Sequence, residues 1–322
     1  MNDDDLATLL ALTELQGIGD ARALELFRAF ETGAELRTSP QEAFEKFHYV
    51  DTDTCEKLQQ LEPTVDEYCQ QFRQHRSEGI EVIGIDDERY PQTLRTYHAP
   101  LVLYAKGNLD RLGCQTVSVS GSRRTNEVGQ KWIRNIARGM AGEGYTIVSG
   151  GARGTDTAAH EGALDVNGAT IVVLGTGVNV PYPEKNADLF ANIVDADGLL
   201  LSHRPPAAEP ARYAFPERNQ TLSALSPGIV IVATDGSGGT MAQYEIAVDQ
   251  ERQVFVPDAS LNIQPNEGLK ELRSSESTTV VSSAAAIEAE ITETSPHEHR
   301  ESTSEEDSTN GDNQTSLDKW NN

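Results

Sequence analysis

Cysteine, basic residues and long apolar runs are all scarce in this 322-residue chain. The three cysteines, Cys55, Cys69 and Cys114, are too few and too scattered for a disulfide framework or a zinc site. The chain has no P-loop motif G-x-x-x-x-G-K-[ST], no dinucleotide fingerprint G-x-G-x-x-G and no nucleophile elbow G-x-S-x-G. These absences argue against P-loop NTPases, NAD- or FAD-dependent enzymes and zinc enzymes, and we expect neither a cofactor nor a metal.

The charge balance is strongly acidic, with 26 lysines and arginines against 51 acids and a formal net charge of -25. Such a chain has no broad basic face for gripping nucleic acid non-specifically. The same acidity is typical of a protein adapted to high salt, and in that case only local arginine placement indicates the partner. No apolar run approaches 18 residues and the N-terminus lacks a positive region, so we expect a cytoplasmic protein that does not bind membranes.

Residues 1–78 have a helical pattern. Leucines from Leu6 to Leu15 form one apolar helix face, and the chain then turns on Gly17 and Gly19 into a second helix. This spacing resembles a helix-hairpin-helix, whose turn offers backbone N–H groups to a phosphate. A plain packing hairpin is the alternative, and the acid Asp20 after the turn favours it.

Residues 79–260 alternate between short apolar runs and amphipathic stretches. The runs lie at 80–85, 101–105, 116–120, 145–149, 169–174, 228–234 and 252–256, and the main stretches at 127–142, 155–166, 184–194, 217–226 and 240–250. This alternation predicts an α/β fold, a Rossmann-like and mostly parallel sheet with helices on both faces.

We expect a short extension over 261–285. A disordered acidic tail is expected over 286–322, because about ten acids face two bases from Glu288 onward; a partner-binding tail ending in Leu317 and Trp320 is the alternative.

Three predicted strand ends combine glycine, arginine and small polar residues. They are VSVSGSRRTNEVG (117–129), IVSGGARGTDTAAH (147–160) and YAFPERNQTLSALS (213–226). Because parallel strands end at one edge of the sheet, Arg123, Arg153 and Arg218 should meet there. Clustered guanidinium groups without a P-loop lysine suggest several phosphates along a backbone.

Three other residues near these loops have simpler interpretations. Asp156 is expected to be a charge at a helix N-terminus that holds Arg153 or backbone amides, rather than a catalytic acid. His160 is expected to be a hydrogen-bonded core histidine rather than a general base. Tyr182 is expected to be a ring that packs within its loop.

Together, five segments resemble the DprA/Smf family of DNA-processing proteins in their order and spacing. They are GSRRTNEVG, IVSGGARGTDTAAHEGAL, TIVVLGTGVNVPYPEKN, FPERNQTLSALSPGIVIVAT and SGGTMAQYEIAVDQERQVFVPD. The upstream segment YPQTLRTYHAPLVLYAKGN is similar to the family's entry segment. The resemblance covers about residues 1–260.

This resemblance implies a non-catalytic protein that binds single-stranded DNA, protects it and passes it to a RecA-family recombinase, often as a homodimer. Carried over by position, it implies phosphate contacts from Gly121, Ser122, Arg123, Ser149, Gly150, Arg153, Gly154, Asn186, Arg218, Asn219, Ser237 and Gly238. It implies that Asp156 and Phe215 shape the pocket, with Phe215 beside a base or only supporting the loop.

The chain departs from the family pattern at three places. The expected Ser-Gly-Ser loop followed by an apolar helix is replaced by DGSGGTMAQYE. The usual basic run F-P-x-R-N-R is replaced by Phe215–Gln220, in which Gln220 removes a charge and the acid Glu217 precedes Arg218. We expect this to weaken phosphate attraction. The acidic tail stands where many members carry a winged-helix-like domain, so functions of that domain are not transferred.

Two rival functions would use the same pocket. The stretch Gly238–Thr240 followed by Glu245 resembles the P-G-G-x-G-T-x-x-E motif of nucleoside-monophosphate phosphoribohydrolases, but its glutamate falls about one helical turn late. A nucleotide-sensing scaffold is the other rival. Hydrolysis requires Glu245 or Asp156 to face the pocket, whereas strand binding requires a groove long enough for several phosphates.

Overall fold

The computed structural model describes residues 1–294, and its N-terminal part is helical, as the sequence predicts. The elements of this part are α1 (Asp3–Thr13), α2 (Asp20–Phe27), α3 (Gly33–Thr38), the 3-10 helix η1 (Gln41–Phe44), α4 (Thr52–Leu58) and α5 (Glu62–Ser77). The α1 leucines are buried as far as Leu12. Between α1 and α2, Gly17 adopts a φ of 85° and its carbonyl accepts a hydrogen bond of 2.7 Å from Arg22 Nη1. The predicted hairpin is therefore present, and contact of its turn with DNA stays a prediction.

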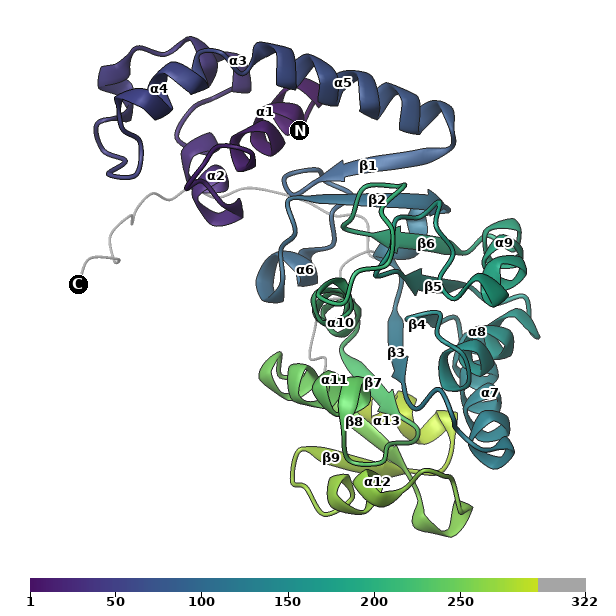
Figure 1. Ribbon diagram of the computed structural model, residues 1–322. Helices are drawn as coiled ribbons and strands as arrows, with labels where there is room; N and C mark the ends of the chain where they lie inside the picture. Colours follow the sequence, from purple (N-terminus) through teal and green to yellow (C-terminus); the bar gives the residue numbers. More distant parts are fainter. Residues whose placement is uncertain (295–322) are drawn as a thin grey trace, which may run out of the picture.

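The rest of the described chain is built around one nine-stranded sheet (Figure 1). Its strands are β1 (Ile80–Gly84), β2 (Val102–Gly107), β3 (Thr116–Ser120), β4 (Thr146–Ser149), β5 (Thr170–Val173), β6 (Leu199–Ser202), β7 (Gly228–Ile231), β8 (Gln253–Pro257) and β9 (Thr278–Val281). Their order across the sheet is β1-β2-β6-β5-β4-β3-β7-β8-β9. Neighbours from β6 to β9 are parallel, whereas β2 is antiparallel to both β1 and β6. The prediction of a mostly parallel α/β sheet is confirmed.

Helices cover both faces of the parallel part of the sheet. They are α7 (Glu127–Gly142), α8 (Thr155–Leu164) and α9 (Ala187–Asp195) on one face, and α10 (Ala214–Ala224) and α11 (Gly238–Asp249) on the other (Figure 1). Because both faces are covered, the central strands are buried throughout, which explains why they appear as unbroken apolar runs in the sequence.

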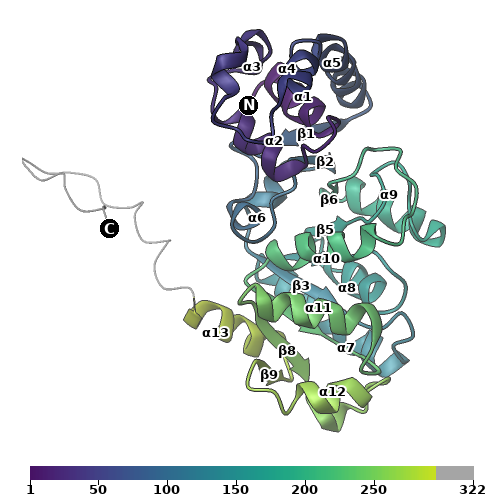
Figure 2. The same cartoon turned by 60° about the vertical axis from the view of Figure 1, so that its left-hand side comes forward.

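Smaller elements complete the fold. They are α6 (Gln92–Tyr97), η2 (Leu109–Gly113), η3 (Glu184–Asn186), η4 (Ala259–Leu261), α12 (Glu267–Leu272) and α13 (Ala284–Thr294). The N-terminal helices lie at the β1 end of the sheet, and α12 and β9 lie at the opposite end (Figure 2).

The C-terminal boundaries differ from those predicted. Strand β9 pairs with β8, so the sheet continues beyond residue 260 into the segment expected to be a short extension. Helix α13 includes residues 286–294, which we predicted to be disordered. That prediction was wrong because Ile287 and Ile291 are buried and the helix packs against α7, so the acidic composition of the segment hid an apolar helix face. The rest of the predicted tail, 295–322, lies outside the described residues.

Candidate functional site

The strand order changes direction beside β3, and this point places the site. From β3 the chain winds through β4, β5 and β6 to one side, and it returns to add β7, β8 and β9 on the other side. The loops that follow β3 and β7 therefore diverge onto opposite faces and leave a crevice at the carboxyl ends of these strands. Open parallel sheets bind ligands in this crevice.

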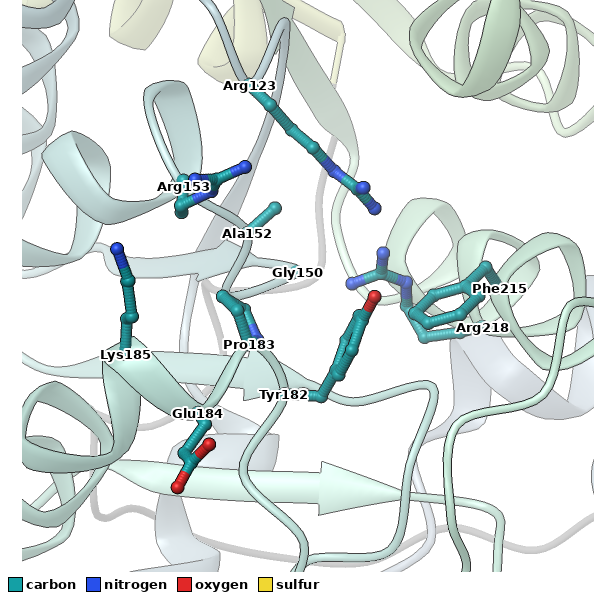
Figure 3. A pocket seen from close by; sticks show the side chains of 10 residues that line it. All are labelled: Arg123, Gly150, Ala152, Arg153, Tyr182, Pro183, Glu184, Lys185, Phe215 and Arg218. Atoms are coloured by element: carbon teal, nitrogen blue, oxygen red, sulfur yellow. The ribbon is translucent and has the colours of Figure 1, made fainter.

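Two adjoining cavities occupy the crevice. The first, of about 230 Å³, is lined by Arg123, Gly150, Ala152, Arg153, Tyr182, Pro183, Glu184, Lys185, Phe215 and Arg218 (Figure 3). The second, of about 410 Å³, is lined by Ser120, Gly121, Ser122, Arg123, Arg124, Ala152, Asp156, Phe215, Arg218, Asn219, Thr234, Asp235, Ser237, Gly239 and Thr240. Both cavities share Arg123, Ala152, Phe215 and Arg218. We call the two together the groove.

Arg218 forms the floor of the groove. It lies on α10 with only 8% of its surface exposed, and its Nη1 donates a hydrogen bond of 2.8 Å to the Val173 carbonyl at the end of β5. Its Nε is buried without a partner among the described residues, and burial lowers the pKa of the guanidinium. The guanidinium lies so close to Gly150 that a Cβ at that position would overlap it, which explains the glycine there.

Asp156 lies next to this arginine in the second cavity. Its carboxylate accepts a hydrogen bond of 3.1 Å from the Ala152 amide, so it holds the loop before α8 as the sequence predicts. Burial raises the pKa of Asp156 to about 6, and the nearby positive charges of Arg218 and Arg123 limit this rise. The floor of the groove thus combines a buried guanidinium with a buried carboxyl group.

The other cations of the groove are exposed; Arg124 lies 3.7 Å from the Asp235 carboxylate, and the remaining three have no such neighbour. Within residues 1–294, no carboxylate lies within ion-pair distance of Arg123, Arg153 or Lys185. Arg123 reaches into the space above Arg218, and Lys185 points toward Arg153 (Figure 3). The predicted meeting of the three loop arginines at one sheet edge is therefore present, with a lysine added.

Glycines allow the loops to approach one another closely. A Cβ on Gly121 would overlap the side chain of Thr155, and Gly154 adopts a φ of 77° against the backbone of Arg123. The Thr155 hydroxyl donates a 3.1 Å hydrogen bond to the Ser122 carbonyl. These contacts lock the loop after β3 onto the N-terminus of α8.

Four of the predicted phosphate ligands do not line either cavity: Ser149, Gly154, Asn186 and Gly238. The Ser149 hydroxyl donates to the Val119 carbonyl at 2.8 Å. The Asn186 amide donates to the Gly151 carbonyl at 2.8 Å. In this structure the side chains of Ser149 and Asn186 are engaged in shaping the loops. Gly121, Ser122, Asn219 and Ser237 do line the second cavity.

The two departures in the α10 motif point away from the groove. The Glu217 carboxylate lies 3.5 Å from His203 Nε2, and the Gln220 side chain accepts a 2.8 Å hydrogen bond from Gln250. Neither residue lines a cavity, although Arg218 between them does. Adjacent residues of a helix face about 100° apart, so the Glu217 carboxylate points away from the groove that Arg218 lines. The structure therefore gives no direct route by which Glu217 would weaken the attraction of a phosphate to Arg218.

Sequence reasoning missed several lining residues, of which Tyr182 and Lys185 are the most telling. Both belong to the segment that follows β5, and Tyr182 was interpreted as a loop-packing ring. It does contact Phe215, with ring centroids 5.6 Å apart, but it is 39% exposed and lines the first cavity. The sequence did contain a signal for this position, because the segment follows a parallel strand and such segments lie at the edge of the sheet where ligands bind.

Two residues considered for catalysis lie outside the groove. His160 is fully buried, shares a 2.7 Å hydrogen bond with the Thr170 hydroxyl, and has its pKa lowered to about 3 by burial, as expected for a core histidine. Glu245 is exposed on α11 and lines neither cavity.

Within residues 1–294 there is no cluster of side chains suited to a metal ion, and no helix is both long and apolar enough to cross a membrane.

Comparisons with known proteins agree on one family. A family model described as DNA recombination-mediator protein A matches residues 81–292. Protein Smf of Escherichia coli is 37% identical over 188 residues, which are 58% of this chain and 50% of that protein, so the chain spans half the length of this relative.

Two solved structures share the fold. The X-ray structure of DNA processing protein A (DprA) from Streptococcus pneumoniae has a TM-score of 0.63 and 30% identity, and the match covers 85% of this chain and 98% of that one. DNA processing protein A from Helicobacter pylori, in a study of its single-stranded DNA binding mode, has a TM-score of 0.59 and 26% identity, with 66% and 96% covered. With the family model spanning most of the sheet, the chain belongs to the DNA recombination-mediator protein A family.

Proposed function

We propose that this protein binds single-stranded DNA in the groove and acts as a non-catalytic recombination mediator. The observation that carries the proposal is the set of unneutralised cations, Arg123, Arg153 and Lys185, above the buried Arg218. In a chain with a net charge of -25, such a local concentration of positive charge selects an anionic ligand. Two adjoining cavities provide length for more than one phosphate, and the structural relative from Helicobacter pylori is described as a single-stranded DNA binder.

The proposal includes a cytoplasmic setting, a homodimer and transfer of the strand to a RecA-family recombinase. These three parts rest on what the family resemblance implies, and the description of the matching family model, DNA recombination-mediator protein A, supports the recombination role. The proposal includes no catalytic step. The phosphoribohydrolase alternative lacks its motif glutamate, because Glu245 lines neither cavity. Asp156 does line the second cavity, where its Oδ2 accepts a hydrogen bond from the Ala152 amide, so a nucleotide-hydrolysis assay with Asp156→Asn as the control tests this alternative.

The test is fluorescence anisotropy of a labelled oligo-dT with the full chain at a series of KCl concentrations. We expect Arg123→Ala to lose roughly tenfold or more in affinity and to flatten the salt slope by about 0.7, the value for one phosphate contact on a single strand. The matched control is Arg134→Ala. Arg134 is paired with Glu161 and Asp165 away from the groove, so its loss should leave both quantities unchanged.

Two results would contradict the proposal. One is absence of oligo-dT binding by the wild-type chain at every salt concentration. The other is equal losses in Arg123→Ala and Arg134→Ala, because equal losses indicate a general charge effect rather than a groove.

A further inference from the structure

A third cavity lies apart from the groove, where the N-terminal helices meet strand β2. Its volume is about 220 Å³, and it shares no lining residue with either cavity of the groove. Helices α1 and α5 and the first residue of α2 line it together with β2 and the segment that follows β6. Its lining includes Leu10, Asp20, Tyr68, Val102, Tyr104 and His203. None of these residues takes part in the proposed function.

Tyr104 carries a hydroxyl group that the fold leaves without a partner. Only 4% of this β2 residue is exposed, and its hydroxyl makes no hydrogen bond with any of the described residues. Its ring is held in place, because the His75 ring of α5 contacts it at an angle of 85°, with centroids 5.8 Å apart. Polar groups this deeply placed are almost always hydrogen-bonded in folded proteins. A ligand in the cavity would supply a partner.

A second tyrosine of the cavity is fixed from another side. The Tyr68 hydroxyl of α5 donates a hydrogen bond of 2.6 Å to the Glu14 carboxylate. Burial raises the pKa of both Tyr68 and Tyr104, so both stay uncharged at neutral pH. Leu10 and Val102 add apolar surface to the same cavity. The lining is thus apolar and aromatic, and the faces of aromatic rings attract cations because their π electrons carry partial negative charge.

The charge available in this cavity is negative. Asp20 is an exposed lining residue, and within residues 1–294 no lysine or arginine lies within ion-pair distance of its carboxylate. Arg22, two positions further along the chain, donates instead to the Gly17 carbonyl at 2.7 Å. His203 is the one lining residue that could become positive, and burial lowers its pKa, so it is neutral at pH 7. The cavity therefore favours a cation over an anion.

We propose that this cavity binds a small organic ammonium compound, with its cationic group beside Asp20 and the Tyr104 hydroxyl and its apolar part between the helices and β2. The ammonium N–H groups donate to the carboxylate and to the hydroxyl oxygen, neither of which has another partner among the described residues. The volume is sufficient, since a cavity of about 150 Å³ holds benzene. The site does not depend on strand binding in the groove.

The experiment is isothermal titration calorimetry of the full chain at pH 7 with benzylamine, a cation, and with benzyl alcohol, its neutral analogue of the same shape. We expect benzylamine to bind about tenfold more tightly, the combined effect of a carboxylate and an aromatic face on one positive charge. In Asp20→Asn this ratio should fall about fivefold while binding of benzyl alcohol is unchanged. Tyr104→Phe keeps the ring and should weaken benzylamine binding about threefold, because the hydroxyl acceptor is lost.

Asp66→Asn is the matched control, because Asp66 is an exposed acid of α5 that does not line the cavity. It removes the same charge and should leave both affinities unchanged. Equal affinity of the wild-type chain for the two probes overturns the proposal, and so does absence of benzylamine binding. Neither result requires a variant to fold, and neither bears on oligo-dT binding. Unchanged benzylamine affinity in folded Asp20→Asn and Tyr104→Phe also overturns it, as does an equal loss in Asp66→Asn, because the acidic surface as a whole would then be the binder.

Discussion

Asp156 and Arg218 share the floor of the groove, and burial shifts the pKa of each toward its uncharged form. Asp156 is only 6% exposed, and the groups that face it are Arg218, Arg123 and the amides of Gly150 and Ala152. Its pKa is raised from 3.8 to about 6, so between these values the folded protein holds a proton that the unfolded chain has released. This site's contribution to stability is therefore complete below pH 3.8 and is lost as the pH rises through about 6.

Asp156→Asn should remove this pH dependence, because an amide does not titrate while its oxygen still accepts from the Ala152 amide. Two pKa units correspond to on the order of 3 kcal/mol. We expect the free energy of unfolding of the wild type, relative to Asp156→Asn, to decrease by about this amount between pH 3.5 and pH 7. Urea unfolding at both pH values measures it, and a constant difference would contradict the raised pKa.

The same substitution should also strengthen strand binding at neutral pH. An ionised Asp156 repels a phosphate that approaches Arg218, whereas the protonated or amide form does not. We expect Asp156→Asn to bind oligo-dT more tightly than the wild type at pH 7, and the gap to close below about pH 5. A gap that is the same at both pH values would indicate a change of shape rather than of charge.

The loop between β4 and α8 makes two different demands on its glycines. At Gly150 a Cβ would overlap the guanidinium of Arg218, a side chain that is able to shift; the backbone there does not have a positive φ. At Gly154 the φ is 77° and a Cβ would meet the backbone of Ser122 and Arg123, which is held in place by hydrogen bonds. The first demand concerns the ligand site and the second concerns the fold.

Alanine at these two positions should therefore have separable effects. We expect Gly150→Ala to weaken oligo-dT binding about tenfold with little change in Tm, because it displaces Arg218. We expect Gly154→Ala to lower the free energy of unfolding by more than about 1 kcal/mol. Gly113→Ala is the control, since Gly113 lines neither cavity of the groove, a Cβ there meets nothing within 4 Å and the φ is ordinary. Thermal unfolding and anisotropy on all three variants would refute the distinction if Gly150→Ala proved as destabilised as Gly154→Ala.

At the scale of elements, the sequence predicts what burial and turn chemistry impose. The strands that end at Ser120 and Ser149 are almost wholly buried because helices cover both sheet faces, and the glycines that follow them are recognisable as turns. Strands β6 and β9 were missed, the first because its apolar run is short and the second because it is half exposed. The sequence also did not predict where the side chains of Glu217 and Tyr182 point. The first depends on how α10 is rotated about its axis, and the second depends on the contact of the loop after β5 with Phe215.

At the scale of the whole molecule, the excess of acids should make folding dependent on salt. Most of the ion pairs of the described residues are exposed and contribute little, so their screening costs little. Self-repulsion of a net charge of -25 acts over the whole surface. Raising KCl from 0.1 M to 1 M shortens the screening length from about 10 Å to about 3 Å. We expect Tm to rise over this range in a thermal unfolding series, and a constant or falling Tm would contradict this account.

The antiparallel pairing of β2 with β6 limits how the N-terminal helices can be removed from the sheet or exchanged for those of a relative. Strand β1 follows directly after α5 and lies at the sheet edge, so the helical bundle is attached through hydrogen-bonded strands rather than through a tether. A cut at residue 79 would leave β1 without its covering helices, and a cut after Gly107 would expose the edge of β6. Grafting or gene fusion that exchanges the bundle must therefore carry the β1–β2 hairpin with it and supply a new partner for β6.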